Sequence, residues 1–263
     1  DKGKEEKASP DYGDEMKENP SQESGQDPSP KEDEQKEEKA GTAQAKPSED
    51  GEDAEDTKQA ERVLAVLRKR FPEPASELDW KNPWELLVST VLAAQCTDKR
   101  VNMVTPELFK RWPGPCELAE ASQEELESVI RSTGFFRQKA KNLRATGRMV
   151  CEDFQSEPPR TMAELVTLPG VARKTANIVL SGGYNIHEGI AVDTHVRRLS
   201  YRLGLTDSTN PQVIEKDLMP LFPQEAWGEI NHLLVLFGRY LCVARKPKCG
   251  ECELAVECPK RGV

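Results

Sequence analysis

Four cysteines near the C-terminal end of the sequence have the spacing of a metal-binding site. Cys242, Cys249, Cys252 and Cys258 follow one another with six, two and five residues between them. Four thiolates from so short a stretch can surround either a single tetrahedral zinc ion or a cubic iron–sulfur cluster. Their geometry leaves both open, whereas four unligated cysteines crowded in this way are rare in a reducing compartment.

The loop between the first two of these cysteines is basic and contains Arg245, Lys246 and Lys248. A loop that is fixed by its ligands loses little entropy on binding, so its cations suit a phosphate backbone. A charged loop that is merely solvated would have the same composition.

A second group of residues, 168–176, reads Leu-Pro-Gly-Val-Ala-Arg-Lys-Thr-Ala between two apolar helical patterns. Pro169 and Gly170 therefore predict a tight turn between two helices. The backbone N–H groups that begin the second helix, from Ala172 and Arg173 onward, would point outward. Together with the helix dipole they can bind phosphate without reading a base sequence. A hairpin with a purely structural role would look the same.

Lys174 falls in the first turn of that second helix. The positive end of the helix dipole disfavours an ammonium there, and partial burial would act in the same direction. A free amine can attack an electrophilic carbon and form a Schiff base. The alternative is an ordinary exposed lysine.

Asp193 follows the apolar residues 190–192 and precedes His195 at the expected start of another helix. An aspartate is a natural N-cap at this position. The two roles are compatible, because a capping carboxylate held near Lys174 can also stabilise developing positive charge and assist proton transfers.

The elements that must position these residues are all expected to be helices. An N-cap residue followed three positions later by an acid predicts helix starts at Asn82, Ser122 and Thr161. The best strand candidate, 189–192, is very short, so the sequence predicts an all-α protein. Apolar residues recur with a period of 3.6 over the following segments: 98–111, 122–132, 138–152, 193–203, 211–221 and 225–241.

The N-terminal residues differ from the rest of the chain in charge. Residues 1–58 contain 20 Asp and Glu and 9 Lys and Arg, whereas 59–263 contain 26 acidic and 28 basic residues. The net charge of −9 therefore describes the tail and does not argue against a nucleic-acid partner for the remainder. Tyr12 and Met16 are the only large apolar side chains in residues 1–57. We expect this segment to be a disordered acidic tail.

Cysteine number and hydropathy restrict the compartment. Seven cysteines, an odd number, with no signal-peptide pattern argue against a secreted disulfide framework. The longest apolar run, 86–92, is too short to span a bilayer, so we expect a soluble chain with no membrane partner.

At these residues the sequence resembles the endonuclease III family of helix-hairpin-helix DNA glycosylases, over about residues 60–263. The resemblance rests on the hairpin with Lys174, the Val-Asp-Thr-His segment at 192–195 and the four-cysteine spacing. It implies a four-iron four-sulfur cluster that has a structural and DNA-positioning role. It also implies a two-domain helix-hairpin-helix fold with double-stranded DNA in the cleft. The domains would be a helical barrel at 79–190 and a second helical domain formed by 58–78 and 191–263.

The family implies a bifunctional DNA glycosylase and abasic-site lyase that excises oxidised pyrimidines in base excision repair. After the damaged base is flipped out, Lys174 would displace it at C1′, with Asp193 as electrostatic and proton-transfer partner. The resulting Schiff base would undergo β-elimination and nick the strand.

Two segments, 94–98 and 134–140, resemble the DNA-penetrating loops of the family. Gln95 would fill the vacated space and Phe135, where family members often have Leu, would wedge into the opposite strand. The other DNA contacts that we expect are Gly170, Ala172, Arg173, His195, Arg245 and Lys246.

Ala172 departs from the family, whose hairpins usually have Gly there. A helical alanine would be acceptable, whereas a positive φ would cost energy.

Two alternatives remain: an adenine-mismatch glycosylase, which lacks the lysine, and a non-catalytic iron–sulfur DNA-binding protein. Lys174 argues against the first alternative, and Lys174 together with Asp193 argues against the second. We expect a monomer that acts on damaged bases or abasic sites, in the nucleoid-containing cytoplasm of a bacterium or in the nucleus of a eukaryote.

Overall fold

The computed structural model describes residues 49–263, with side chains from Glu55 onward, so most of the predicted disordered tail lies outside the described residues. Within them the chain is helical, and the predicted all-α class is confirmed. The strand candidate 189–192 is irregular backbone. The α-helices are α1 (Glu49–Arg70), α2 (Pro83–Leu92), α3 (Asp98–Arg111), α4 (Pro115–Glu120), α5 (Gln123–Ile130), α6 (Phe136–Asp153), α7 (Met162–Leu165), α8 (Arg173–Tyr184), α9 (Thr194–Leu203), α10 (Pro211–Leu218) and α11 (Trp227–Tyr240). Short 3-10 turns are η1 (Arg131–Thr133), η2 (Gln224–Ala226) and η3 (Cys249–Glu251).

The predicted helix starts are confirmed at all three capping signals. Asn82, Ser122 and Thr161 each accept a hydrogen bond from the backbone N–H three residues later. The Ser122 hydroxyl also donates to the Glu125 carboxylate, which ties the cap to the first turn of α5. At Asn82 the acid, Glu85, instead accepts from the N–H of the residue before the cap.

The first helix begins earlier than the sequence pattern indicated. We predicted a tail that ends at residue 57, but α1 begins at Glu49. Residues 49–58 contain six acids and one lysine. Negative charge near a helix N-terminus is favourable, because the dipole is positive there, and α1 ends correspondingly on Arg68, Lys69 and Arg70. A charge pattern that suggests disorder is therefore also compatible with the start of a helix.

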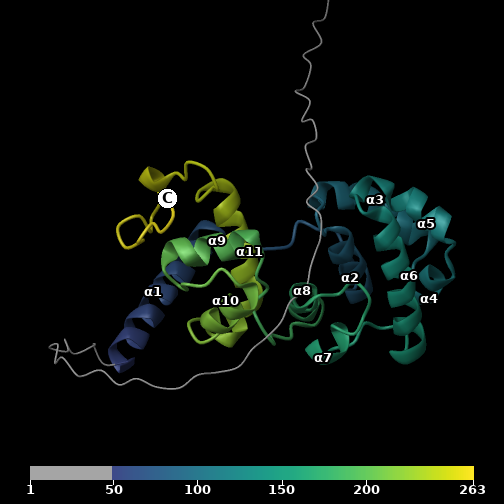
Figure 1. Cartoon of the computed structure of the whole chain (residues 1–263), viewed down its shortest axis with the longest axis horizontal. Helices are drawn as coiled ribbons and strands as arrows, with labels where there is room; N and C mark the ends of the chain where they lie inside the picture. Colours follow the sequence, from purple (N-terminus) through teal and green to yellow (C-terminus); the bar gives the residue numbers. More distant parts are fainter. Residues whose placement is uncertain (1–48) are drawn as a thin grey trace, which may run out of the picture. The chain divides into compact units, whose positions relative to one another are not determined.

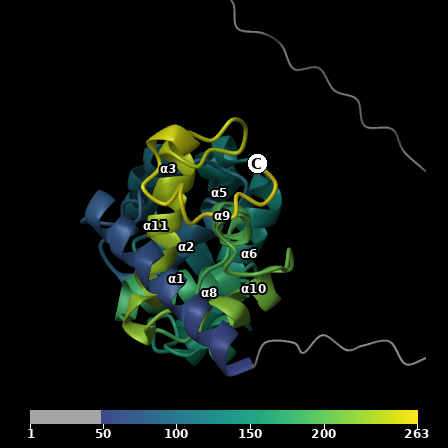
Figure 2. The ribbon, with the colours of Figure 1, turned by 90° about the vertical axis from the view of Figure 1, so that its left-hand side faces the viewer.

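The described chain has two apolar cores. One is formed by α2 to α8 and includes Leu87, Leu143 and Leu180, and we call this part the barrel half. The other is formed by α1, α9, α10, α11 and the C-terminal residues 241–263, and we call this part the cluster half. Figure 1 shows the two groups of helices, with α8 beside α11. Figure 2 shows α1 crossing the face of the cluster half, with the C-terminal segment above it.

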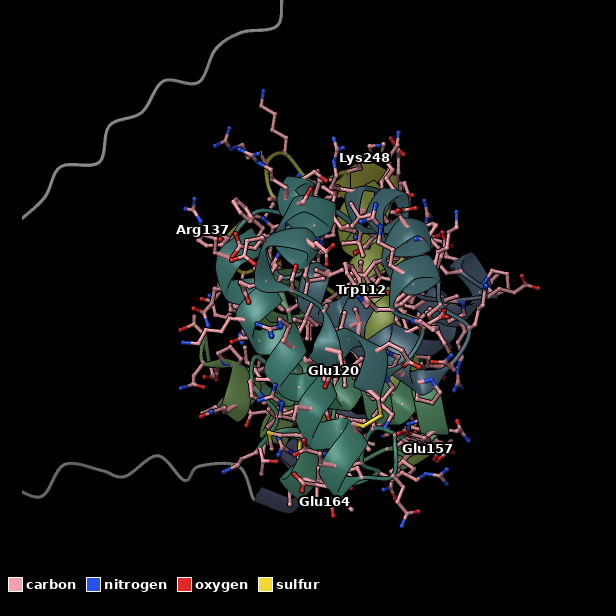
Figure 3. The ribbon with its side chains drawn as sticks, turned by 90° about the vertical axis from the view of Figure 1, so that its right-hand side faces the viewer. Trp112, Glu120, Arg137, Glu157, Glu164 and Lys248 are labelled. Carbon is pink, nitrogen blue, oxygen red and sulfur yellow. A yellow bond between two sulfur atoms is a disulfide. The ribbon has the colours of Figure 1, made fainter. Side chains whose placement is uncertain are left out.

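A disulfide joins Cys116 of α4 to Cys151 of α6 in the barrel half (Figure 3). From the odd number of cysteines we expected no secreted disulfide framework. The structure has this one disulfide, which the sequence did not predict. The remaining cysteines, Cys96 and the four near the C-terminal end, are free thiols. Among the described residues, no helix is long and apolar enough to cross a membrane.

Candidate functional site

The helix-hairpin-helix turn is held by α6. Thr146 of that helix is buried and donates a hydrogen bond to the Pro169 carbonyl at 2.9 Å. Gly170 has a φ of +82°, and a Cβ there would lie 2.7 Å from the Asn142 side-chain nitrogen. Only glycine meets both conditions without strain. The barrel half thus fixes the direction in which α8 starts.

Ala172 is the N-cap of α8, with φ −93° and ψ 166°. It is therefore neither helical nor strained, and the predicted gain in helix propensity over glycine does not apply at this position. The alanine side chain cannot accept a hydrogen bond from the N–H groups of the first turn, so α8 has no side-chain cap. The N–H groups of its first turn are left for a ligand, and an anion is the ligand that a helix N-terminus favours.

Arg173, which we expected to contact DNA, uses its side chain within the protein. Its Nε donates to Glu215 of α10 at 2.6 Å, and this bond raises the pKa of Arg173. Asn177 donates to the other oxygen of the same buried carboxylate at 2.8 Å. Gly189 makes room for the group, since a Cβ there would lie 2.0 Å from the carboxylate. The Arg173 side chain thus pairs within the protein through Nε, while it remains partly exposed.

A cleft of about 570 Å³ brings Lys174 and Asp193 together from the two halves of the molecule. Lys174 is exposed in it, so the partial burial that we expected is not observed. Gln95 and His195 also line this cleft. Residues that are more than ninety positions apart in the sequence therefore share one site.

Asp193 caps α9 with a single oxygen. Its Oδ1 accepts from the backbone N–H groups of His195 and Val196, both at 2.8 Å. Among the contacts of the described residues, Oδ2 receives no hydrogen bond. The carboxylate is held rigidly while one oxygen is free to act toward the cleft, as an N-cap with a second role requires.

His195 has a polar contact on its ring. Its Nδ1 lies 3.3 Å from Nη2 of Arg198, one turn later in α9. Burial lowers the pKa of His195, and the positive charges of Arg198, Arg239 and Lys174 act in the same direction, against Asp193. The positive charges around His195 therefore favour the neutral form of its imidazole.

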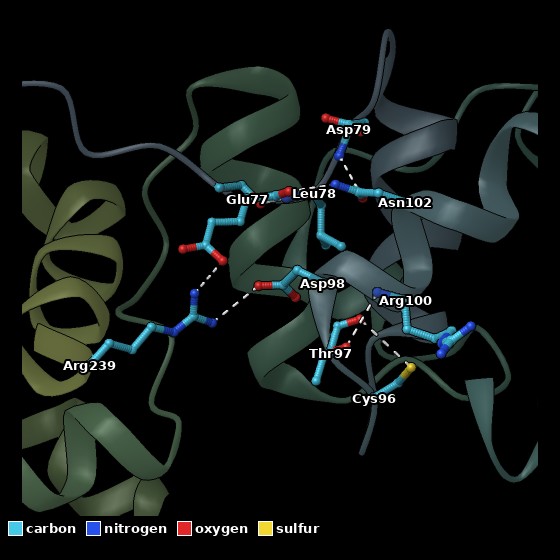
Figure 4. Close-up of polar contacts among 10 residues, drawn as sticks. Glu77, Leu78, Asp79, Cys96, Thr97, Asp98, Arg100, Asn102 and Arg239 are labelled. Atoms are coloured by element: carbon cyan, nitrogen blue, oxygen red, sulfur yellow. Dashed lines mark hydrogen bonds and ion pairs between the residues drawn. The ribbon is translucent and has the colours of Figure 1, made fainter. Parts of the chain in front are cut away.

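Arg239 of α11 links the two walls of the cleft. It forms ion pairs with Glu77, in the segment before α2, and with Asp98, the first residue of α3 (Figure 4). The Nη2–Oδ2 distance to Asp98 is 3.2 Å. Burial lowers the pKa of Arg239, but the bonds to the two carboxylates outweigh it and the pKa is raised. This cross-connection was not predicted from the sequence.

The two loops expected to penetrate DNA have strained tips. Gln95 and Phe135 have φ values of 53° and 47°, which non-glycine residues rarely adopt. Both side chains are exposed, and Phe135 is 65% accessible. Such strain is typical of residues that a functional constraint holds in place. Gln95 lies three residues beyond the end of α2 and does not cap it.

The four cysteines of the C-terminal segment line one pocket. In the part of the chain that the structure describes, no three Cys, His, Asp or Glu side chains converge on a point where one metal ion could be held. Four thiols around one pocket can hold either a zinc ion or an iron–sulfur cluster. Burial raises the pKa of Cys252 and of Cys258, and the neighbouring thiols add to it. Positive charge in the pocket would reverse that effect.

Two arginines of α9 hold the backbone of this segment. Arg202 is buried and donates to the carbonyls of Val243 and Ala244 at 2.8 and 2.9 Å. Arg198 donates to the Cys242 carbonyl at 3.2 Å. The same segment presents Arg245 and Lys246 to solvent, the latter with a φ of 55°. The predicted phosphate contacts are thus exposed on a supported loop.

Comparisons with protein families agree with this geometry. Residues 88–224 match the HhH-GPD superfamily base excision DNA repair protein, which includes the hairpin and both cleft residues. Residues 242–258 match the iron–sulfur binding domain of endonuclease III, which begins and ends at the first and last of the four cysteines. The expected cofactor, a four-iron four-sulfur cluster, is confirmed.

Relatives and solved structures agree on the family. Endonuclease III of Synechocystis sp. is 52% identical over 77% of this chain and 92% of its own length, and that of Bacillus subtilis is 45% identical over 76% and 92%. A non-covalent endonuclease III–DNA complex superposes with a TM-score of 0.73 at 42% identity, and it covers 78% of this chain and 95% of the solved chain. A trapped endonuclease III–DNA covalent intermediate gives 0.72, also at 42% identity, over 78% and 96%. The chain belongs to the endonuclease III family of base excision repair enzymes, the DNA glycosylases with abasic-site lyase activity.

Proposed function

We propose that the enzyme excises oxidised pyrimidines from duplex DNA with the Lys174 amine as nucleophile, and that it then nicks the strand at the abasic site. The observation that carries the proposal is the shared cleft, into which α8 brings Lys174 and α9 brings Asp193. The solved relative trapped as a covalent intermediate with DNA supports a covalent route. We further propose that the two halves of the molecule act as the domains 79–190 and 58–78 with 191–263, and that the enzyme acts as a monomer.

Binding depends on groups that contact phosphate without reading sequence. The uncapped N-terminus of α8, with Gly170 and the backbone of Ala172 and Arg173, provides one such contact. Arg245 and Lys246, exposed on the cysteine-bearing segment, provide another. The cluster, held by its four cysteines, fixes the loop that carries these two cations.

The chemistry needs the damaged nucleotide outside the helix, at an unstacking cost of a few kcal/mol. Gln95 and Phe135, at the strained loop tips, would occupy the opening. The Lys174 nitrogen then forms a bond to C1′ while the bond from C1′ to the base breaks and the base leaves with a proton. The sugar ring opens to a Schiff base, which makes the C2′ proton acidic.

Asp193 supports both steps through the oxygen that does not cap α9. A carboxylate beside C1′ stabilises the positive charge that develops as the base departs. It can also take the proton that Lys174 loses on forming the imine, and assist removal of the C2′ proton. Loss of that proton expels the 3′ phosphate, so the strand is cut by β-elimination.

Borohydride trapping tests the proposal, because a reduced Schiff base is a stable cross-link. With an oxidised pyrimidine or an abasic site in duplex DNA, the wild-type chain should form the cross-link and Lys174→Gln should not. The variant should still bind duplex, since the phosphate contacts remain. A cross-link of normal yield with Lys174→Gln would refute the assignment.

Asp193→Asn separates capping from catalysis, since asparagine is as good an N-cap. Stability should change little, while turnover falls by about 10²–10⁴-fold. An equally stable variant with full turnover would leave Asp193 a cap alone.

The bacterial relatives support a place in the bacterial cytoplasm.

A further inference from the structure

Lys139 is a buried lysine that contacts neither the cleft nor the solvent. It lies in the first turns of α6 and its side chain is 5% accessible. Its Nζ donates to the Leu92 carbonyl at 2.8 Å and to the Thr133 carbonyl at 2.7 Å. Leu92 is the last residue of α2 and Thr133 the last residue of η1. One ammonium therefore joins the ends of two helical segments that are far apart in the sequence.

These two helix ends are the bases of the loops with strained tips. Gln95 follows Leu92 by three residues, and Phe135 follows Thr133 by two. The bridge thus lies directly behind both side chains that enter the duplex. If Gln95 and Phe135 are to occupy the same opened step of DNA, the distance between their loops must be fixed before binding.

Burying a lysine at this position costs free energy unless its ammonium group makes compensating interactions. Its two hydrogen bonds go to carbonyl oxygens, and among the ion pairs of the described residues none involves Lys139. Burial lowers the pKa of Lys139, although the nearby Cys96 opposes this. An apolar side chain of similar volume would often stabilise such a position equally well. The ammonium is instead suited to helix C-termini, where carbonyls lack partners and the dipole is negative.

We propose that Lys139 is a positioning residue that sets the spacing of the Gln95 and Phe135 loops, so that both enter the duplex together while the damaged nucleotide is turned out. The inference rests on the proposed function, since it assigns those loops to the opening of the duplex. It places Lys139 in the steps before bond breaking and outside the chemistry at Lys174.

The test compares duplex and single-stranded DNA. An abasic site in a single strand needs no base to be flipped and no gap to be filled, whereas the same site in a duplex needs both. Lys139→Met removes the charge and both hydrogen bonds while it keeps most of the volume. We expect single-turnover borohydride trapping to fall by about tenfold or more on the duplex and to stay within about twofold on the single strand. The fluorescence of 2-aminopurine opposite the lesion, which reports unstacking, should fall in parallel.

Lys141→Met is the matched control, because Lys141 lies on the same helix, is exposed and carries the same charge. Its ratio of duplex to single-strand trapping should equal that of the wild type. Lys139→Gln is the second variant, for the case that Lys139→Met does not fold: it can satisfy one carbonyl but cannot join both loops, and it should show the same loss on duplex.

A merely structural role gives a different result. A folded Lys139 variant with a lower melting temperature and an unchanged ratio would overturn the positioning role. If the wild type traps neither substrate, the proposed function fails. If all proteins trap both substrates equally well, the function stands and the role of Lys139 is refuted.

Discussion

In the barrel half, the disulfide joins two helices that already pack against each other. In the cluster half, four cysteines hold a segment that has almost no core of its own. Cys116 and Cys151 connect α4 and α6, which share an apolar interface around Leu118 and Leu143. Between residues 242 and 263, by contrast, Leu254 is the only buried apolar side chain among the described residues. The disulfide thus adds stability to helices that already pack together, whereas the four cysteines take the place of an apolar core in residues 242–263.

The difference shows how each half holds its DNA-contacting residues. The loops of Gln95 and Phe135 start from helices packed in the apolar core of the barrel half, where the Lys139 bridge also joins them. Arg245 and Lys246 lie on backbone that is held by the arginines of α9 and by the cysteines. The position of these two cations should therefore depend on the cofactor far more than that of the barrel loops does.

Loss of the cluster tests this contrast with the largest expected effect. In Cys252→Ala, or after removal of iron, residues 241–263 should lose their structure, because ligand binding is the main term that orders them. Binding to duplex DNA should weaken by about tenfold to a hundredfold as the two cations are released from their positions. Hydrogen exchange resolved by segment should show protection lost in 241–263 and kept in α2, α6 and α8. Equal loss in both halves would mean that the cluster supports the whole fold.

Loss of the disulfide should change stability alone. The bridge closes a segment of 35 residues, so removing it should lower the free energy of unfolding by about 2–4 kcal/mol through the entropy of the unfolded chain. The double variant Cys116→Ser, Cys151→Ser should keep the trapping rate of the wild type, since neither residue lines the cleft. Denaturation with and without a reductant measures this: the reductant should reproduce the shift in the wild type and leave the variant unchanged. A variant that loses activity would show that the bridge also shapes the site.

The sequence predicted what is local along the chain and missed what joins distant segments. Caps at Asn82, Ser122 and Thr161, the hairpin at 168–172 and the cysteine spacing are each encoded within a few residues, and the structure has the caps and the hairpin where they were expected. The short α4 was missed, because six residues hold too little periodicity to predict a helix. The start of α1 was missed because acidic residues suit both disorder and a helix N-terminus.

Buried charged residues give a partial signal in the sequence. Lys139, Arg202 and Glu215 each occupy a position on the buried face of an amphipathic helix, with apolar residues three or four positions away. A charge at such a position predicts a buried polar contact, because an unpaired one would be too costly. It does not predict the partner: each of the three side chains has a partner about 40 residues away, and Lys139 has a second one six residues away. The connections between segments therefore required the structure.

The ion pairs of Arg239 test the same comparison, since the pair with Asp98 of α3 joins the cluster half to the barrel half. Arg239→Gln should lower the free energy of unfolding by only about 0.5–1 kcal/mol, because the three side chains are partly exposed. The rate of turnover on damaged duplex should fall by about tenfold, because the two walls of the cleft would no longer be held at a fixed distance. Arg68→Gln is the control: Arg68 pairs with Glu229 inside the cluster half, and its loss should leave turnover unchanged. Equal effects of the two variants on turnover would assign the Arg239 pairs to stability alone.

The smallest effect concerns pH and also separates the halves. Burial lowers the pKa of His232 in α11, against the opposing charges of Asp193 and Asp98, and it lowers the pKa of His195 in α9. Both groups belong to the cluster half.

A histidine whose folded pKa lies below its unfolded value of about 6.5 takes up its proton more readily when unfolded. The stability of this half should therefore be complete above about pH 6.5 and should be lost as the pH falls below it. Segment-resolved hydrogen exchange at about pH 5.5 and pH 7.5, corrected for the intrinsic rate, should show the loss in α9 and α11 and leave α2 to α6 unchanged. His232→Gln should reduce the loss, because glutamine does not titrate. If the variant keeps the full pH dependence, or if α2 to α6 lose protection equally, the buried histidines are not its source.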